Sequence, residues 1–112
     1  MKKLFAFLVL ALSMNAFAGN IEAGKAAAQK YNCAACHGAD YNNPIDPSYP
    51  KLAGQHPDYL EHALVAYQRG GNGGNGRANA IMGGMAKPLS KKEIGDIAAY
   101  LASLPSSLVV RK

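Results

Sequence analysis

The amino-acid sequence predicts an all-α fold, with three main helices joined by long loops rich in Gly and Pro. Residues 58–68 and 90–104 both carry apolar side chains at the spacing of a helix. Residues 21–35 are rich in alanine, which has the highest helix propensity. No stretch shows the alternation of apolar and polar residues that is typical of a half-buried strand. The 112 residues are enough for one domain.

The first 18 residues have the layout of a secretory signal peptide. Two lysines follow Met1, an unbroken apolar run covers residues 4–12, and an Ala-Phe-Ala sequence ends at Ala18. The apolar run is too short to anchor the chain, because crossing a bilayer takes about 20 apolar residues. We therefore expect cleavage after Ala18 and an exported mature domain, residues 19–112, without a membrane span.

An irregular loop and a flexible connector separate the predicted helices. Residues 38–54 follow the first helix and contain three prolines and an Asn-Asn pair, which disfavour regular structure. Pro57 stands just before the second helix, residues 58–68. Residues 70–76, with the sequence GGNGGNG, predict a solvated connector.

The last helix has the clearest signals at both of its ends. Ser90 followed by Glu93 fits a capping box, in which each side chain accepts a hydrogen bond from a free backbone N–H. Pro105 stops the helix, and residues 106–112 read as a frayed tail. The apolar stripe between the ends consists of Ile94, Ile97, Ala98, Leu101 and Leu104.

Size and cysteine content limit what can stabilise the domain. The mature chain of 94 residues buries only roughly 60 to 65% of its unfolded surface, which leaves it marginally stable alone. Chains this small often gain stability from disulfides, metals or a bound group. The only cysteines are Cys33 and Cys36, and a disulfide across so small a loop stabilises little. Any such stabilisation must therefore come from something other than a disulfide.

The charge balance is mildly basic. The whole chain has a formal net charge of +5, and removal of the first 18 residues leaves +3. No basic cluster is interleaved with aromatic residues, so a nucleic-acid partner is not expected. The balance fits steering toward an acidic protein partner and, equally, ordinary solvated charge.

The segment Cys-Ala-Ala-Cys-His at residues 33–37 carries the chemistry. Cys33 and Cys36 are three residues apart, so in a helix or turn they face the same way and can each bond one vinyl group of a haem. His37 follows directly and can ligate the iron. This pattern predicts one covalently attached haem c.

Two other sites share these residue types and are less favoured. A thioredoxin-like dithiol needs a strand–helix–strand setting, and no strand is predicted before Cys33. A structural zinc site needs four ligands, and only His56 or His62 is available to join Cys33, Cys36 and His37.

A second axial ligand is expected from Met82 or Met85. Glycines lie between the two methionines and let the backbone approach a flat porphyrin closely. A thioether ligand raises the reduction potential, whereas a methionine that is not a ligand fills gaps in the core. We expect one methionine in each role. Ligation by His56 or His62 instead would lower the potential and is less favoured.

These motifs together resemble the class I cytochromes c. The chain is similar to the periplasmic single-haem forms and to one half of the bacterial dihaem cytochromes, over almost all of residues 22–104. The resemblance rests on residues 33–38 (CAACHG), 50–55 (PKLAGQ), 82–90 (MGGMAKPLS) and 97–101 (IAAYL).

The resemblance implies particular residue roles. In similar proteins the ligand methionine often lies eight residues before the serine that opens the last helix, which selects Met82 over Met85 as the ligand opposite His37. The first and last helices of the family cross where a small residue meets an aromatic one, and Gly24 and Tyr100 are the matching pair.

Partly buried haem propionates need hydrogen-bond donors. By residue type and loop position, the candidate donors are Tyr49, Lys51, Gln55 and Arg77.

The resulting expectation is a periplasmic single-electron carrier with a low-spin His/Met haem, and not an enzyme, since both axial positions are filled. Its partners would be an electron donor and an acceptor, such as a membrane cytochrome complex, a terminal oxidase or a periplasmic dehydrogenase. The alternatives are a haem enzyme or sensor with a labile sixth ligand, and a subunit dedicated to one dehydrogenase or oxidase.

Overall fold

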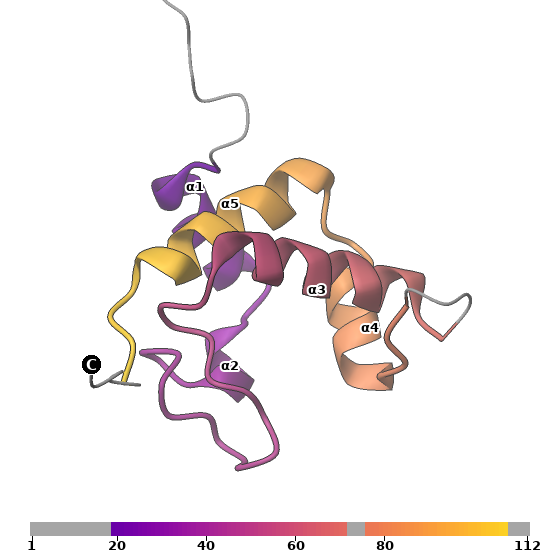
Figure 1. Ribbon diagram of the computed structural model, residues 1–112, viewed down its shortest axis with the longest axis horizontal. Coiled ribbons are helices and arrows are strands. Elements are labelled where there is room, and N and C mark those ends of the chain that lie inside the picture. The colour runs from indigo at the N-terminus through magenta and orange to yellow at the C-terminus, as the bar shows by residue number, and fades with distance from the viewer. Residues whose placement is uncertain (1–18, 72–75, 108–112) are drawn as a thin grey trace, which may run out of the picture.

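A computed structural model describes residues 19–71 and 76–107. The predicted signal peptide, part of the GGNGGNG connector and the end of the predicted tail lie outside the described residues. Every regular element in the described part is a helix, as the sequence predicts (Figure 1). None of these helices is long and apolar enough to cross a membrane. The helices are α1 Ile21–Lys30, α2 Ala34–His37, α3 Pro57–Arg69, α4 Ala80–Ala86 and α5 Lys91–Ser103.

The predicted first helix, residues 21–35, is divided in two. The helix α1 ends at Lys30, and Asn32 takes the left-handed conformation with φ 57°. A left-handed residue cannot continue a right-handed helix, and Asn tolerates this conformation better than most residues. The prediction extended the helix too far because alanine propensity outweighed this one turn residue. The attachment segment consequently starts in the turn and continues into α2.

The helices α3 and α5 agree with the prediction. The helix α3 covers the predicted residues 58–68 with one more residue at each end. Both bonds of the capping box are present at the start of α5: Ser90 Oγ accepts from the Glu93 amide, and Glu93 Oε1 accepts from the Ser90 amide, each at 3.0 Å. The helix stops at Ser103, two residues before Pro105.

The helix α4 was not predicted, because two successive glycines have low helix propensity. Asn79 caps it: its Oδ1 accepts a hydrogen bond of 2.9 Å from the Met82 amide. A Cβ added at Gly83 would lie 3.6 Å from the carbonyl oxygen of Tyr67, so this glycine faces α3 at ordinary contact distance. Capping and packing on α3 therefore overcome the weak local preference.

The helices α1 and α5 cross at a glycine, and in Figure 1 α1 lies behind α5. Gly24 is buried, and a Cβ added there would overlap the carbonyl group of Asp96 and lie 2.8 Å from Tyr100 Cβ. The pairing of Gly24 with Tyr100 is thus confirmed. Only glycine permits so close an approach of the two backbones.

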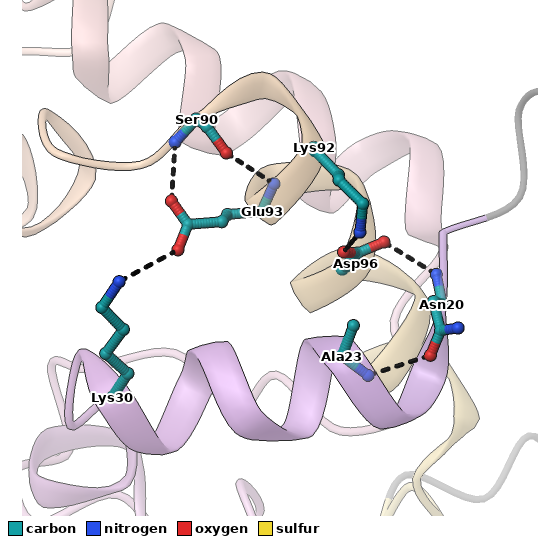
Figure 2. A network of polar contacts seen from close by, with 7 residues as sticks. All are labelled: Asn20, Ala23, Lys30, Ser90, Lys92, Glu93 and Asp96. Atoms are coloured by element: carbon teal, nitrogen blue, oxygen red, sulfur yellow. Dashed lines mark hydrogen bonds and ion pairs between the residues drawn. The ribbon is translucent and has the colours of Figure 1, made fainter.

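Polar contacts join α1 and α5 on both sides of this crossing (Figure 2). On one side the Asn20 amide donates to Asp96 Oδ1 at 2.8 Å, and Lys92 Nζ lies 2.6 Å from Asp96 Oδ2. On the other side Lys30 Nζ lies 3.8 Å from Glu93 Oε2. Burial works to raise the pKa of Asp96, but the bonds from Lys92 and Asn20 outweigh it and hold that pKa below its usual value.

The apolar core of the described residues combines small and large side chains. Five of its eleven members are alanines, and the other six are leucine, isoleucine or tyrosine. Alanine removes little apolar surface from water, so nearly half of the core positions add little hydrophobic stabilisation. The core consists of Ala27, Ala28, Tyr41, Ala53, Leu60, Ala86, Leu89, Ile94, Ile97, Ala98 and Leu101.

Candidate functional site

His37 is the last residue of α2 and is fixed by a loop carbonyl. Its side chain is buried, with 6% of the residue exposed, and its Nδ1 lies 3.0 Å from the Pro50 carbonyl oxygen. A carbonyl oxygen only accepts, so Nδ1 carries the proton and donates. The lone pair is then on Nε2, which is the form of imidazole that binds iron.

The loop that supplies this carbonyl is irregular, as predicted, and is anchored by Tyr41. The Tyr41 carbonyl oxygen accepts from the amides of Leu52 and Ala53 at 2.9 and 3.2 Å. The Tyr41 ring is buried edge-on against Tyr100, with centroids 6.1 Å apart. Burial also raises the pKa of Tyr41 to about 12, so the phenol stays neutral. These contacts hold the chain just after Pro50 on the core.

Cys33 and Cys36 are both free and half-buried. The Cys36 amide donates to the Cys33 carbonyl oxygen at 3.3 Å, so one turn of backbone separates the two residues. Burial raises the pKa of the Cys33 thiol, which opposes the thiolate that zinc requires. In the part of the chain that the structure describes, no three His, Cys, Asp or Glu side chains form a group able to hold a metal ion. The zinc alternative therefore has no ligand set there.

Met82 and Met85 both lie on α4, one turn apart. Met82 is half-buried, whereas 38% of Met85 is exposed. The Asn79 cap fixes the backbone at Met82. Met82 is therefore the more enclosed of the two methionines, and its backbone is bound by the helix cap.

The histidines considered as other ligands lie at the surface. His56 precedes α3 as its N-cap residue, His62 lies within α3, and both are exposed. Neither is buried as His37 is.

Two of the predicted propionate donors, Tyr49 and Lys51, line one pocket in the loop before α3. Tyr49 lies beside His37, with ring centroids 6.4 Å apart. The Gln55 side chain accepts from the neighbouring His56 amide at 3.0 Å, and Lys51 is exposed in the same loop. Arg77 contacts α3 instead, through a hydrogen bond of 3.3 Å to the Tyr59 hydroxyl. All four residues stay predicted propionate donors.

Sequence reasoning missed two residues that shape this region. The Pro50 carbonyl oxygen orients His37, and the Gln68 amide binds two carbonyls at the end of α4. Pro50 opens the PKLAGQ motif, and this motif was the sequence signal that could have drawn attention to it. Nothing in the pattern around Gln68 distinguished it from an ordinary helix-surface residue.

Comparisons with known proteins agree with this geometry. The family model for cytochrome c matches residues 21–105. Cytochrome c-554(548) of Halomonas halodenitrificans is 47% identical over 72 residues, which are 63% of this chain and 82% of that protein. Cytochrome c4 of Thiocapsa roseopersicina is 42% identical over 89 residues, which are 80% of this chain and 42% of that one.

A solved structure, reduced recombinant cytochrome c4 from Pseudomonas stutzeri, superposes with a TM-score of 0.70 at 41% identity. The match covers 81% of this chain and 48% of that one. The chain thus spans about half the length of the cytochromes c4 that it matches.

Fold, attachment segment and relatives together define a class I c-type cytochrome. The chain belongs to the cytochrome c family, and it resembles one half of a dihaem cytochrome c4. Its cofactor is one covalent haem c, to which the cysteine pair Cys33 and Cys36 and the adjacent His37 point. The residues fit this group, because the two half-buried cysteines lie one turn apart and the His37 Nδ1 contact leaves the lone pair on Nε2.

Proposed function

We propose that this chain is a periplasmic single-electron carrier in which His37 and Met82 ligate the haem iron. Export is supported by the signal-like layout of residues 1–18, whose removal would leave the domain from Gly19 onward. Electron transfer is supported by membership of the cytochrome c family.

The observation that carries the proposal is the bond between His37 Nδ1 and the Pro50 carbonyl oxygen. It fixes the ring orientation and keeps Nε2 free to act as a ligand throughout the redox cycle. The carbonyl also increases the basicity of the imidazole, which strengthens its bond to iron. A rigid ligand reduces the rearrangement that accompanies each electron transfer.

Met82 is proposed as the opposite ligand because it is more enclosed than Met85 and is held by the Asn79 cap. A haem c held by Cys33, Cys36, His37 and Met82 would supply one-electron chemistry between a reduced donor protein and an oxidised acceptor protein. A thioether at Met82 favours the ferrous form and raises the reduction potential. Two protein ligands leave no iron position for a substrate, so no catalysis is proposed.

The partners are proposed to be a donor and an acceptor protein of the periplasm. A second candidate function is a haem subunit dedicated to one dehydrogenase. One relative, 36% identical over 65% of this chain, is named the cytochrome subunit of sulfide dehydrogenase of Chlorobaculum tepidum. Copurification of this chain with one enzyme at a fixed ratio would favour that candidate over a free carrier.

The ligation is tested by the visible absorption spectrum of the exported protein, oxidised and then reduced. We expect sharp low-spin bands and the weak sulfur-to-iron band in the far red. Met82→Ala should abolish the far-red band and let carbon monoxide bind the reduced protein, whereas Met85→Ala should change neither.

The reverse pattern would assign the ligand to Met85. A wild-type spectrum without the far-red band would reject both methionines and favour a sensor, an enzyme or a bis-histidine centre.

A further inference from the structure

The segment that carries Met82, residues 76–89, depends on other parts of the molecule for its position. Its only helix, α4, has seven residues and two internal glycines. A helix so short is not stable on its own in water, because nucleation is unfavourable and few backbone bonds follow it. Contacts with α3 must therefore determine where Met82 lies.

At its start the segment is attached to α3 through Arg77. The Arg77 amide donates to the Ala66 carbonyl oxygen at 2.9 Å. The guanidinium lies 5.6 and 5.5 Å from the ring centroids of Tyr59 and Tyr67. Arg77 is exposed, however, and water weakens cation–π contacts at such sites.

At its end the segment is attached to α3 through Gln68. The Gln68 Nε2 group donates to the carbonyl oxygens of Ala86 and Leu89, at 2.9 and 2.8 Å, and so uses both of its hydrogens. The Ala86 carbonyl oxygen also accepts from the Leu89 amide at 3.0 Å, so Gln68 adds a second hydrogen bond at Ala86 and ties the turn after α4 to α3. Gln68 is half-buried and Ala86 is fully buried, so water is a poor substitute here.

We propose that Gln68 is the positioning residue for the sixth ligand, and that its two hydrogen bonds set how readily Met82 leaves the iron. The inference rests on the proposed ligation by Met82. Ala86 follows Met82 by four residues, which is about one turn of α4, so a bond at Ala86 fixes the turn that bears the thioether. Release of Met82 requires this turn to move away from α3 and to break the Gln68 bonds.

The test is displacement of Met82 by imidazole in the ferric holoprotein, followed through the far-red band. Gln68→Leu removes both donors and keeps an apolar stem, and Gln68→Glu keeps the length and replaces the donors by acceptors. The matched control is Gln29→Leu, at an exposed glutamine on α1. Loss of two neutral hydrogen bonds should lower the imidazole concentration for half displacement about tenfold in both Gln68 variants. The control should behave as wild type.

Hydrogen exchange of the holoprotein gives a second readout. Amides of residues 80–89 should exchange faster in the Gln68 variants, while those of α1 and α5 should be unchanged. Unaltered imidazole displacement in both variants would overturn the inference, as would equal acceleration of exchange over the whole protein. Failure of both variants to load haem, with Gln29→Leu loading normally, would overturn it in favour of a general folding role. A wild-type protein without the far-red band would instead refute the proposed ligation.

Discussion

At the scale of single residues, the close approach of α1 and α5 at Gly24 predicts a strong effect of one methyl group. Gly24→Ala would press a Cβ against the Asp96 carbonyl group and the Tyr100 side chain. Overpacking of this kind costs about 1–3 kcal/mol, and the helix-propensity gain of alanine offsets only about 1 kcal/mol. Denaturant unfolding should show a lower midpoint, whereas Lys25→Ala at the next, exposed position should not. An unchanged midpoint for Gly24→Ala would mean that the helices can separate without cost.

Asp96 predicts a dependence of stability on acid. Its pKa is held below the usual value in the folded protein, so it contributes stability above the unfolded pKa and loses it as pH falls through the folded pKa. Unfolding free energy should therefore decline as pH drops below about 4. Asp96→Asn should lower the stability by about 1 kcal/mol at neutral pH and flatten that decline. If the unfolding free energy of the wild type and of Asp96→Asn fell equally with decreasing pH, other carboxyl groups would be the cause of the decline.

At the scale of elements, the start of α5 depends on its capping box. Ser90→Ala removes the oxygen that accepts from the Glu93 amide and should cost about 1 kcal/mol. Ser90→Asp restores an acceptor at the same position and should recover most of the loss, because Asp is also a favoured N-cap. Thermal unfolding of the three holoproteins measures both effects. If Ser90→Asp were as unstable as Ser90→Ala, the loss would not be due to capping.

At the scale of the whole molecule, the alanine-rich core predicts that haem attachment is required for a stable fold. A double variant, Cys33→Ser with Cys36→Ser, should lose covalent haem and cooperative thermal unfolding, because the core of this small domain has alanine at five of its eleven positions. Ala35→Ser changes an exposed residue between the two cysteines and should keep both properties. Circular dichroism on heating distinguishes the two. A sharp transition in the double variant would show that the polypeptide core suffices.

The proposed export is also tested at the scale of the whole chain. Mass spectrometry of the protein from a host periplasm should give the mass of residues 19–112 plus one haem, with Gly19 at the start. Retention of residues 1–18 would contradict the proposed signal peptide.

Local patterns in the sequence were sufficient for several features. The apolar spacing of residues 58–68 and 90–104 and the Ser90–Glu93 pair predicted α3, α5 and the cap almost to the residue, because these signals act within one or two helical turns. The spacing of Cys33, Cys36 and His37 predicted haem c, because attachment needs only five consecutive residues. The family resemblance added the pairing of Gly24 with Tyr100.

Only the tertiary structure determined the remaining features. Alanine-rich sequence could not reveal that Asn32 ends α1, and a pair of glycines could not reveal α4, because packing and caps overrode helix propensity at both places. The hydrogen bond between His37 and the Pro50 carbonyl joins residues 13 positions apart. The bonds from Gln68 to the Ala86 and Leu89 carbonyls span 18 and 21 positions. Such contacts depend on how loops and helices meet in space. The sequence by itself thus determined the cofactor, because its attachment pattern is local, and the fold determined how the elements that carry the proposed ligands are held.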